Sequence, residues 1–434
     1  MSRRVKVSGI EWIESIPEDW EVDRLKSRFS FGKGLPITKE NLRESGVSVI
    51  SYGQIHSKHN VGTRVKQELV RYVDESYLVT NASSLVTKGD FVFADTSEDV
   101  NGCGNCVYVD DDITLFAGYH TIILKSKSDV NNKYLAYLFQ TDCWRSQIRA
   151  SVLGVKLFSV TKKLLNNTTI LCPPEKEQER IVKELDVICD NIDELITTNQ
   201  NSIKDYKKYK QSIITEAITK GLNNTALKKT GNIHIPEIPE QWQMKRLKYV
   251  FEIKKDIAGK EGYDILSITQ KGIKVKDISS NEGQLAADYS KYQLVDVGDF
   301  AMNHMDLLTG WVDVSKYAGV TSPDYRVFRF INEDGYCKEY YLYLMQMCYM
   351  NRIFYGLGQG VSNLGRWRLQ ADKFLNFSIP IPPFEEQKAI ATYLDNKCAE
   401  IENLIAAKEK TIKELESYKK SMIYEYVTGK KEVI

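Results

Sequence analysis

An internal duplication constrains the fold of this chain more than any other feature. The segment IPEDWEVDRLKSRF runs from Ile16 to Phe29, and IPEQWQMKRLKYVF runs from Ile238 to Phe251, 222 residues later. Ile, Pro, Glu, Trp, Arg, Leu, Lys and Phe recur in register between the two segments. This period is far longer than the ~20–50 residues of a solenoid repeat, so we expect a duplicated domain.

Two further matches follow at an offset of 209. The segment VTKGDFVF, which starts at Val86, aligns with VDVGDFAM, which starts at Val295. The segment PPEKEQERIVKELD, which starts at Pro173, aligns with PPFEEQKAIATYLD, which starts at Pro382. The change of offset means that the two copies differ by insertions between the first and second matches. We therefore expect a shared frame that holds two diverged globular parts.

A long helix is predicted after each pair of prolines, because Pro suits the start of a helix. Glu residues crowd the first turns of the first helix and Lys residues crowd its end, which complements the helix dipole. Apolar residues alternate three and four apart, which is typical of a coiled coil. Since neither helix can bury this stripe alone, we expect the two helices to pair antiparallel. The seam is predicted to include Leu195, Leu404, Tyr209 and Tyr418, with Asn199 interrupting it.

The remaining segments alternate short β-rich runs with turns, and an aromatic helix is expected from Lys133 and from Lys338. The predicted fold class is α+β, with two mixed α/β globular domains in a pseudo-twofold repeat, joined by two long helices that form an antiparallel coiled coil. Trp20 and Trp242 recur in the repeated frame, so we expect them to be packing anchors. The predicted divisions are a first domain at 1–172, a first long helix at 173–221, a linker at 222–236, a second domain at 237–381 and a second long helix at 382–430.

Composition excludes several classes of protein. A hydrophobic content of 42% and a charged content of 27% are those of a globular rather than a disordered chain. The formal net charge of +1 excludes a generally basic, nonspecific polyanion binder. The sequence has no run of about 18 apolar residues and no apolar segment near its N-terminus, so we expect a cytoplasmic protein without membrane contact.

Sequence motifs for catalysis are absent. There is no GxxxxGK[ST] phosphate loop, no GxGxxG after a strand, and no HExxH or GxSxG. DNA amino-methyltransferases carry Asn/Asp-Pro-Pro-Tyr/Phe, whereas Ile381 to Phe384 reads Ile-Pro-Pro-Phe and lacks the polar acceptor. Cys103 and Cys106 have CxxC spacing but lie in a Gly/Asn turn without a second ligand pair, so we interpret them as hairpin cysteines. No catalytic residue and no metal ligand is predicted.

This plan resembles the specificity subunit of type I restriction-modification enzymes. The resemblance rests on IPEDW…RLK, the GDF run, both PPxxEQ…I…LD blocks and the helix that ends near YKKYKQSIITEAITKG, and it covers nearly the whole chain. It implies two target recognition domains that each read one half of a bipartite double-stranded DNA sequence, with the helices as a ruler between them. It also implies a subunit that is not catalytic alone and that serves defence against foreign DNA.

The resemblance implies partner subunits as well. Two modification (methyltransferase) subunits are expected to dock on the helices and to methylate adenine with S-adenosylmethionine, and restriction subunits are expected to cleave and translocate DNA. No cofactor is expected in this chain, whereas S-adenosylmethionine, ATP and magnesium are expected in the partners.

Candidate DNA-reading residues come from the loops of the diverged parts. Gln and Asn can bond adenine in two places and Arg or Lys can bond guanine, although the basic residues can equally hold phosphates. The candidates are Tyr52, Gln54, Thr96, Ser97 and Lys156 in the first copy, and Gln270, Lys271, Asn303, His304, Gln359, Asn363, Arg366 and Arg368 in the second.

Two other classes of function stay open at this point. A coiled-coil scaffold with duplicated adaptor domains for proteins would explain the helices, but it gives no reason for diverged interiors in a repeated frame. A methyltransferase or nuclease that acts alone is opposed by the missing motifs.

Overall fold

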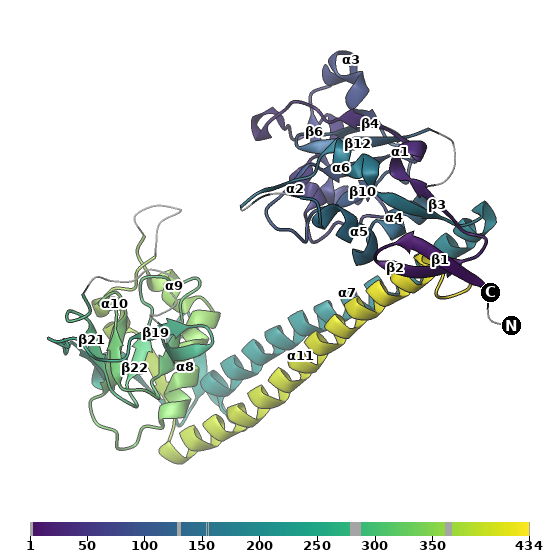
Figure 1. The fold of residues 1–434 in the computed structure, drawn as a ribbon. Coiled ribbons are helices and arrows are strands. Elements are labelled where there is room, and N and C mark those ends of the chain that lie inside the picture. Colours follow the sequence, from purple (N-terminus) through teal and green to yellow (C-terminus); the bar gives the residue numbers. More distant parts are fainter. Residues whose placement is uncertain are drawn as a thin grey trace. The chain divides into compact units, whose positions relative to one another are not determined.

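The chain divides into two compact units, one with residues 1–198 and 410–434 and the other with residues 199–409. Each unit contains one globular part and a portion of both long helices (Figure 1). The computed structural model describes residues 3–127, 132–152, 154, 156–277, 288–360 and 367–433.

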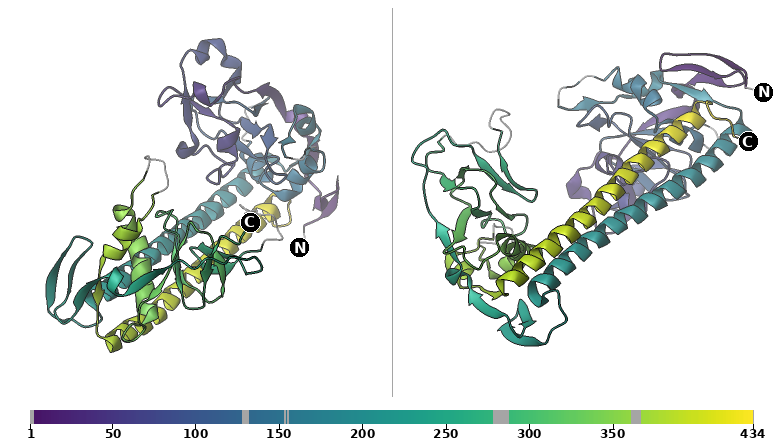
Figure 2. Two further views of the ribbon diagram at one scale, coloured as in Figure 1. Left: turned by 90° about the vertical axis from the view of Figure 1, so that its left-hand side faces the viewer. Right: turned by 90° about the horizontal axis from the view of Figure 1, so that it is seen from below.

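Both predicted long helices are present. α7 runs from Glu175 to Lys220 and α11 from Phe384 to Val427. In the first unit the start of α7 lies beside the end of α11, and in the second unit the end of α7 lies beside the start of α11 (Figures 1 and 2). The helices are therefore antiparallel within each unit, and the predicted antiparallel coiled coil is confirmed.

The seam between the helices differs in part from the predicted one. Four residues that the sequence places there are instead 41–54% exposed, namely Leu195, Leu404, Tyr209 and Tyr418. Asn199, expected to interrupt the seam, is only 7% exposed. It lies one heptad after the buried Ile192 and four residues before the buried Ile203, so Asn199 continues the stripe and Leu195 turns outward.

Each globular part begins with the same hairpin. β1 (Val5–Ile10) pairs with β2 (Ile13–Pro17), and β15 (Leu227–Asn232) pairs with β16 (Ile235–Pro239) in the same register. The structural repeat therefore begins before the first sequence match. Part of the predicted linker 222–236 is strand, because pairing with β16 outweighs the polar, turn-rich composition of that stretch.

A second pair of strands leads each globular part into its long helix. β3 (Glu21–Arg24) pairs with β14 (Thr169–Cys172), and β17 (Gln243–Arg246) pairs with β26 (Ser378–Ile381), again in the same register. β14 and β26 each end at or just before a pair of prolines, where α7 and α11 begin.

The repeated tryptophans are buried and hold the starts of the long helices. The indole nitrogen of Trp20 donates to Glu177 at 3.1 Å, and that of Trp242 donates to Glu386 at 2.8 Å. Neither ring is exposed to solvent. The prediction that both are packing anchors is confirmed.

The Gln of each PPxxEQ block closes the turn before its helix. The side-chain nitrogen of Gln178 donates to the Pro173 carbonyl at 2.8 Å, and that of Gln387 donates to the Pro382 carbonyl at 2.9 Å. The repeated Glu and Gln are therefore structural: the Glu holds the tryptophan and the Gln holds the turn.

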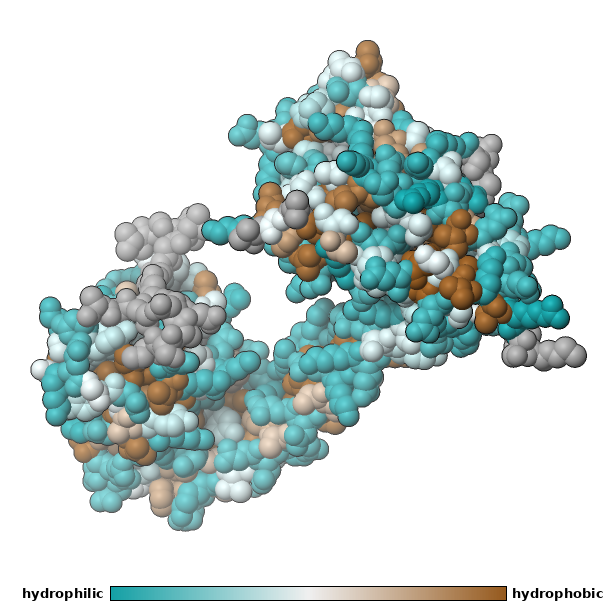
Figure 3. Space-filling model, in the orientation of Figure 1, coloured by the Kyte–Doolittle hydropathy of each residue, from teal (hydrophilic) through white to brown (hydrophobic). Residues whose placement is uncertain are grey.

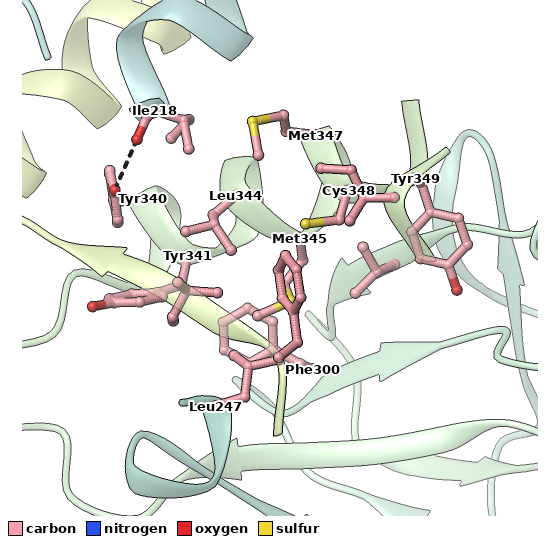
Figure 4. Close-up of a cluster of buried hydrophobic side chains, with 14 of the residues drawn as sticks. Ile218, Leu247, Phe300, Tyr340, Tyr341, Leu344, Met345, Met347, Cys348 and Tyr349 are labelled. Atoms are coloured by element: carbon pink, nitrogen blue, oxygen red, sulfur yellow. Dashed lines mark hydrogen bonds between the residues drawn. The ribbon is translucent and has the colours of Figure 1, made fainter. Parts of the chain in front are cut away.

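The C-terminal end of each long helix packs on the globular part of its own unit. Tyr134 donates to the carbonyl of Val427 at 2.8 Å in the first unit, and Tyr340 donates to that of Ile218 at 3.3 Å in the second (Figure 4). Gly221 follows α7 with a φ of +73°, and a Cβ there would lie 3.1 Å from the Trp242 ring. Glycine suits this position because it adopts positive φ without a steric penalty.

Both units contain a four-stranded antiparallel sheet of the same strand order. The order is β10-β8-β12-β4 in the first unit and β23-β22-β25-β18 in the second. The strands are β4 (Phe29–Lys33), β8 (Phe91–Ala94), β10 (Cys106–Tyr108) and β12 (Thr121–Ser126), and β18 (Phe251–Lys254), β22 (Phe300–Met302), β23 (Val312–Val314) and β25 (Arg326–Phe330). Aromatic residues of these strands, such as Phe91 and Phe300, lie in the buried core of each unit.

The other elements differ between the units. The first unit has a second four-stranded sheet of order β6-β5-β11-β7. In its place, the described residues of the second unit form the strand pairs β19-β20 and β21-β24. The further strands are β5 (Val47–Ile50), β6 (Arg71–Val73), β7 (Leu85–Val86), β9 (Thr96–Ser97), β11 (Leu115–Ala117) and β13 (Phe158–Ser159), and β19 (Leu266–Thr269), β20 (Gly272–Val275), β21 (Gln293–Val295) and β24 (Gly319–Thr321). The short helices are α1 (Leu25–Arg28), α2 (Tyr52–Ile55), α3 (Tyr77–Thr80), α4 (Lys133–Leu138), α5 (Asp142–Arg149), α6 (Lys162–Asn167), α8 (Lys338–Met350), α9 (Ile353–Leu357) and α10 (Ala371–Asn376).

The aromatic helix predicted from Lys338 is α8, but the one predicted from Lys133 is two helices. α4 ends at Leu138, and α5 begins at Asp142. The hydroxyl of Thr141 accepts from the Trp144 amide, so Thr141 is the N-cap of a new helix.

Polar and charged residues cover most of the face drawn in Figure 3, and the hydrophobic residues in view form small separate patches. Among the helices of the described residues, none is both long and apolar enough to cross a bilayer.

Candidate nucleic-acid interface

In the first unit, the chain that follows β8 brings three of the predicted reading residues together. β9 contains Thr96 and Ser97 and pairs with β13, so that Ser97 faces Phe158 and Thr96 faces Ser159. Lys156 is exposed and lies two residues before β13. Thr96 and Lys156 therefore lie on chain segments that this pairing brings together, although 60 residues separate them in sequence. Ser97 is only 4% exposed, and its hydroxyl donates to the Asp99 carbonyl at 2.7 Å, so that hydroxyl is used within the unit.

His56, which the sequence reasoning missed, connects this edge to Tyr52 and Gln54. One ring nitrogen, Nε2, lies 2.8 Å from the Thr96 carbonyl, and the other, Nδ1, lies 3.0 Å from the side-chain nitrogen of Asn105. A carbonyl can only accept, so Nε2 carries the proton and Nδ1 accepts from Asn105. The Tyr52 ring lies 6.3 Å from the His56 ring, edge to face.

The side-chain oxygen of Gln54 is already used within its own turn. It accepts from the Ser51 amide at 3.1 Å, which caps α2. The amide nitrogen of Gln54 is thus the group that can donate to a base, for example to the N7 or O6 of guanine or the O4 of thymine.

Tyr119 and His120 complete an aromatic cluster around Tyr52. Their rings lie 5.5 and 5.4 Å from the Tyr52 ring. His120 has a left-handed backbone, with φ of +53°, and its exposed ring lies 3.2 Å from Asp95. Strain of this kind is frequent at binding sites. No motif marks these two residues, since they lie in a short turn before β12.

In the second unit, four predicted residues meet at the end of β22. Gln359 and Arg368 form an antiparallel bridge, with amide-to-carbonyl distances of 3.0 and 3.1 Å. The Leu369 amide then donates to the carbonyl of His304 at 2.9 Å, next to Asn303. The loops around residues 303 and 368 are therefore in contact. The predicted residues Asn363 and Arg366 lie outside the described residues.

Not all of these side chains face solvent. The Asn303 oxygen accepts from the amides of Met305 and Asp306 at 3.2 and 3.1 Å, so it caps its own loop. The His304 side chain is buried at 5% exposed, whereas Arg368 is exposed. Burial, followed by the charges of Arg326 and Arg368, lowers the pKa of His304 to about 3. His304 is therefore neutral near pH 7.

Gln270 and Lys271 form the turn between β19 and β20. The Gln270 side chain donates to the Thr309 carbonyl at 3.1 Å, in the loop that begins at Asn303. Lys271 is exposed. This turn is thus joined to the same loop cluster.

Arg326, the first residue of β25, was missed because it reads as part of a β-rich run. It is 5% exposed, and burial lowers its pKa to about 10. Its Nη2 donates to the Leu369 carbonyl at 2.8 Å. A third basic group therefore lies beside His304 and Arg368.

The two cysteines of the CxxC run lie in a buried, structural environment. Cys103 lies in a turn and Cys106 opens β10, and both are buried free thiols. Burial raises the pKa of the Cys106 thiol to about 12. Within the part of the chain that the structure describes, no group of three or more His, Cys, Asp or Glu residues could hold a metal ion.

Comparison with known proteins gives consistent matches. The type I restriction modification DNA specificity domain matches the chain twice, over residues 17–205 and 239–417. The MjaVIII specificity subunit of a type I restriction enzyme from Methanocaldococcus jannaschii is 26% identical over 438 residues, covering 96% of this chain and 93% of that protein. The putative MjaX specificity subunit from the same organism is 25% identical, covering 96% and 95%.

A solved structure shares the fold. One chain from a structure that describes complex assembly and conformational transition of the type I R-M system has a TM-score of 0.66 at 19% identity, covering 95% of this chain and 99% of that one. The two family matches fall on the two copies of the internal repeat, one per copy. The chain therefore belongs to the type I restriction-modification DNA specificity family, as a specificity subunit with two DNA specificity domains.

Proposed function

We propose that each unit reads one half of a two-part DNA target through its loop cluster. In the first unit this is the cluster of Tyr52, Gln54, Thr96, Ser97 and Lys156, extended by His56 and His120. In the second unit it is the cluster around Gln270, Lys271, Gln359 and Arg368. The observation that carries the proposal is positional: each cluster is built around the loop that follows one of the equivalent strands, β8 or β22, of a duplicated frame, and the residues of the two clusters differ.

The two clusters differ in side-chain chemistry, which supports the proposal that the two half-sites have different base sequences. The first has Tyr and His rings with a Gln amide, which suit apolar contact with a thymine methyl and donation to a base edge. The second has exposed Lys271 and Arg368. Guanidinium and ammonium groups suit guanine or phosphate.

The partner subunits also belong to the proposal. Tyr209 and Tyr418 occupy equivalent positions of the repeat and are about half exposed on α7 and α11. Tyrosine is enriched at protein interfaces, because it combines a large apolar ring with a hydroxyl. Two equivalent exposed tyrosines suit the docking of two identical modification subunits, one on each.

The chemistry is assigned to those partners. The modification subunits would methylate adenine with S-adenosylmethionine, and restriction subunits that use ATP and magnesium would cleave DNA. The chain would then act in the cytoplasm, where it selects the sequence on which its partners work.

The test is a map of methylated adenines across the genome, with and without this gene. Loss of methylation at one two-part motif, and its return when the gene is supplied again, is the expected result. An unchanged methylation map would favour the alternative of a scaffold for other proteins.

A further inference from the structure

Arg326 is a buried cation for which the described residues provide no counter-ion. Its Nη2 donates to the Leu369 carbonyl, but its Nη1 is buried and has no hydrogen-bond partner among the residues that the structure describes. The guanidinium carbon lies 5.0 Å from the Phe374 ring. Among the described residues no carboxylate forms an ion pair with it, whereas Arg329 on the same strand is paired with Glu252 at 2.7 Å.

The repeat shows that the fold does not need a charge at this position. Arg326 pairs with Met302 of β22. The equivalent pair in the first unit is Ile122 with Phe93. An apolar residue therefore fills the same place in the other copy. Burying an uncompensated guanidinium carries a large desolvation penalty, which the isoleucine does not incur.

Two other residues, His304 and Arg368, lie beside the same stretch of backbone, at Leu369. The Leu369 carbonyl accepts from Arg326 at 2.8 Å, while the Leu369 amide donates to the His304 carbonyl at 2.9 Å. The Nδ1 atom of His304 is also buried, and within the described ranges of the chain it has no hydrogen-bond partner. Arg368, the residue before Leu369, is exposed, and its charge lowers the pKa of both His304 and Arg326. The cluster thus joins one solvent-facing guanidinium to two unsatisfied buried groups.

We propose that this cluster binds one phosphodiester group of the target DNA, with Arg368 in contact with the phosphate and Arg326 behind it as an uncompensated positive charge. The inference rests on the proposed function, which supplies the polyanion. Phosphate suits the cluster because a guanidinium fork binds its oxygens in two places, and because a buried charge is screened little by solvent. Arg326 is therefore a positioning residue rather than a base reader.

The test is the salt dependence of DNA binding by the full chain, using the duplex that the methylation map identifies. Each phosphate contact contributes about 0.9 to the slope of log K against log salt. We expect Arg368→Met to flatten the slope by about one contact. Arg326→Met should flatten the slope by a measurable part of that amount, because Arg326 adds positive charge at the same phosphate without touching it. Arg326→Lys, which keeps the charge, should keep the slope. Arg329→Met removes one exposed charge from the same strand and should also leave the slope unchanged.

Arg326→Met retains much of the bulk of the side chain and removes a buried charge together with its hydrogen bond to the Leu369 carbonyl. Because the buried charge itself is unfavourable, the variant should fold. An affinity lowered at every salt concentration with an unchanged slope would mean that Arg326 only supports the loop, and would overturn the proposal. If Arg326→Met did not fold, a wild-type slope for Arg368→Met would have the same consequence.

A second measurement separates this inference from the proposed function. The thermal unfolding of the full chain is followed in inorganic phosphate and in sodium chloride of equal ionic strength. Phosphate should raise the Tm of the wild type more than that of Arg326→Met. If the chain shows this difference but binds no duplex, the proposed function fails while the anion site stands. If the duplex is bound and neither the slope nor the phosphate effect depends on Arg326, the anion site fails and the proposed function stands.

Discussion

Lys419 donates to both carboxylate oxygens of Asp193 across the helix pair, at 2.7 and 2.8 Å. In the other unit Lys210 forms the corresponding ion pair with Glu402. Each member of one pair lies 209 residues from its counterpart in the other, which is the offset of the sequence repeat. The duplicated frame thus repeats charge pairs between the helices as well as apolar contacts.

Reversing one of these charges should weaken the helix pair modestly. Lys419→Glu places two carboxylates together, and we expect the free energy of unfolding to fall by about 1 kcal/mol, because the pair is partly exposed. Adding Asp193→Lys to the same chain should restore most of the loss. Lys420→Glu, at an exposed neighbouring position, is the control for charge. Equal effects of Lys419→Glu and Lys420→Glu in urea denaturation would refute a specific pair.

The two Gln residues of the PPxxEQ blocks should differ in importance. Gln387 is 1% exposed, accepts from the Cys337 amide at 2.8 Å and donates to the carbonyls of Pro382 and Gly335. Gln178 has the Pro173 contact alone among those described. We expect Gln387→Ala to lower the free energy of unfolding by about 2–4 kcal/mol and Gln178→Ala by about 1 kcal/mol. Similar losses in chemical denaturation would show that the additional buried contacts contribute little.

Much of the frame could be predicted from the sequence, because the repeat itself marks it. The long helices and the buried tryptophans follow from residues that recur in register. The role of the repeated Gln could not be predicted, since its partners are backbone carbonyls that no side-chain pattern reveals. Nor could the outward turn of Leu195, because a 3.5-residue repeat and a neighbouring apolar residue can be aligned in more than one way.

The candidate site was harder to predict, because loops bring its residues together from distant parts of the chain. The segments of Thr96 and Lys156 are brought together by the pairing of β9 with β13. His56 and Arg326 carry no sequence signal, since a single basic residue in a β-rich or helical run is ordinary. Whether any candidate contacts DNA remains a prediction.

The second unit should be sensitive to acid through His304. Its pKa is lowered from 6.5 to about 3 in the folded chain, first by burial and then by Arg326 and Arg368. Between about pH 3 and pH 6.5, the unfolded chain therefore binds a proton at His304 that the folded chain does not. Acid favours the unfolded chain in this range, so the free energy of unfolding is unaffected by His304 above about pH 6.5 and falls as the pH drops toward 3.

His304→Gln removes that proton uptake. Between pH 7 and pH 4.5 we expect the wild type to lose about 2 kcal/mol more than the variant, measured by denaturation at each pH. His59→Gln is the matched control, because His59 is largely exposed. An equal acid sensitivity of wild type and His304→Gln would contradict the assignment.

Replacing His120 by glycine should separate stability from binding. A non-glycine residue in the left-handed region costs about 1 kcal/mol, so His120→Gly should leave the Tm unchanged or slightly raised. It also removes a ring of the aromatic cluster, so recognition of the first half-site should weaken. Arg352 has a φ of +54° and lies in the second unit. Arg352→Gly should relieve similar strain without affecting recognition of the first half-site. If Arg352→Gly weakened methylation at the first half-site as much as His120→Gly does, the role of the His120 ring would be contradicted.

A longer helix pair should lengthen the spacer that the protein recognises. Inserting seven residues after Ser202 in α7 and seven after Lys410 in α11 keeps the heptad phase. It adds about 10 Å to each helix, which corresponds to about three base pairs. The half-site bases should not change. A seven-residue insertion after Glu261, in an exposed loop of the second unit, should leave the spacer as it was. Methylation that persists at the original spacing in the lengthened protein would end the ruler hypothesis.

The attachment of each globular part to its helices uses a small set of repeated contacts: a hairpin, a tryptophan, a glutamine turn and a tyrosine hydroxyl. These contacts are the same in both units, although the globular parts that they attach differ. A genetic exchange confined to the stretch between these contacts would change the DNA sequence that the cell methylates in one step. The exchanged part would fold against the same helices, because the contacts that attach it are unchanged.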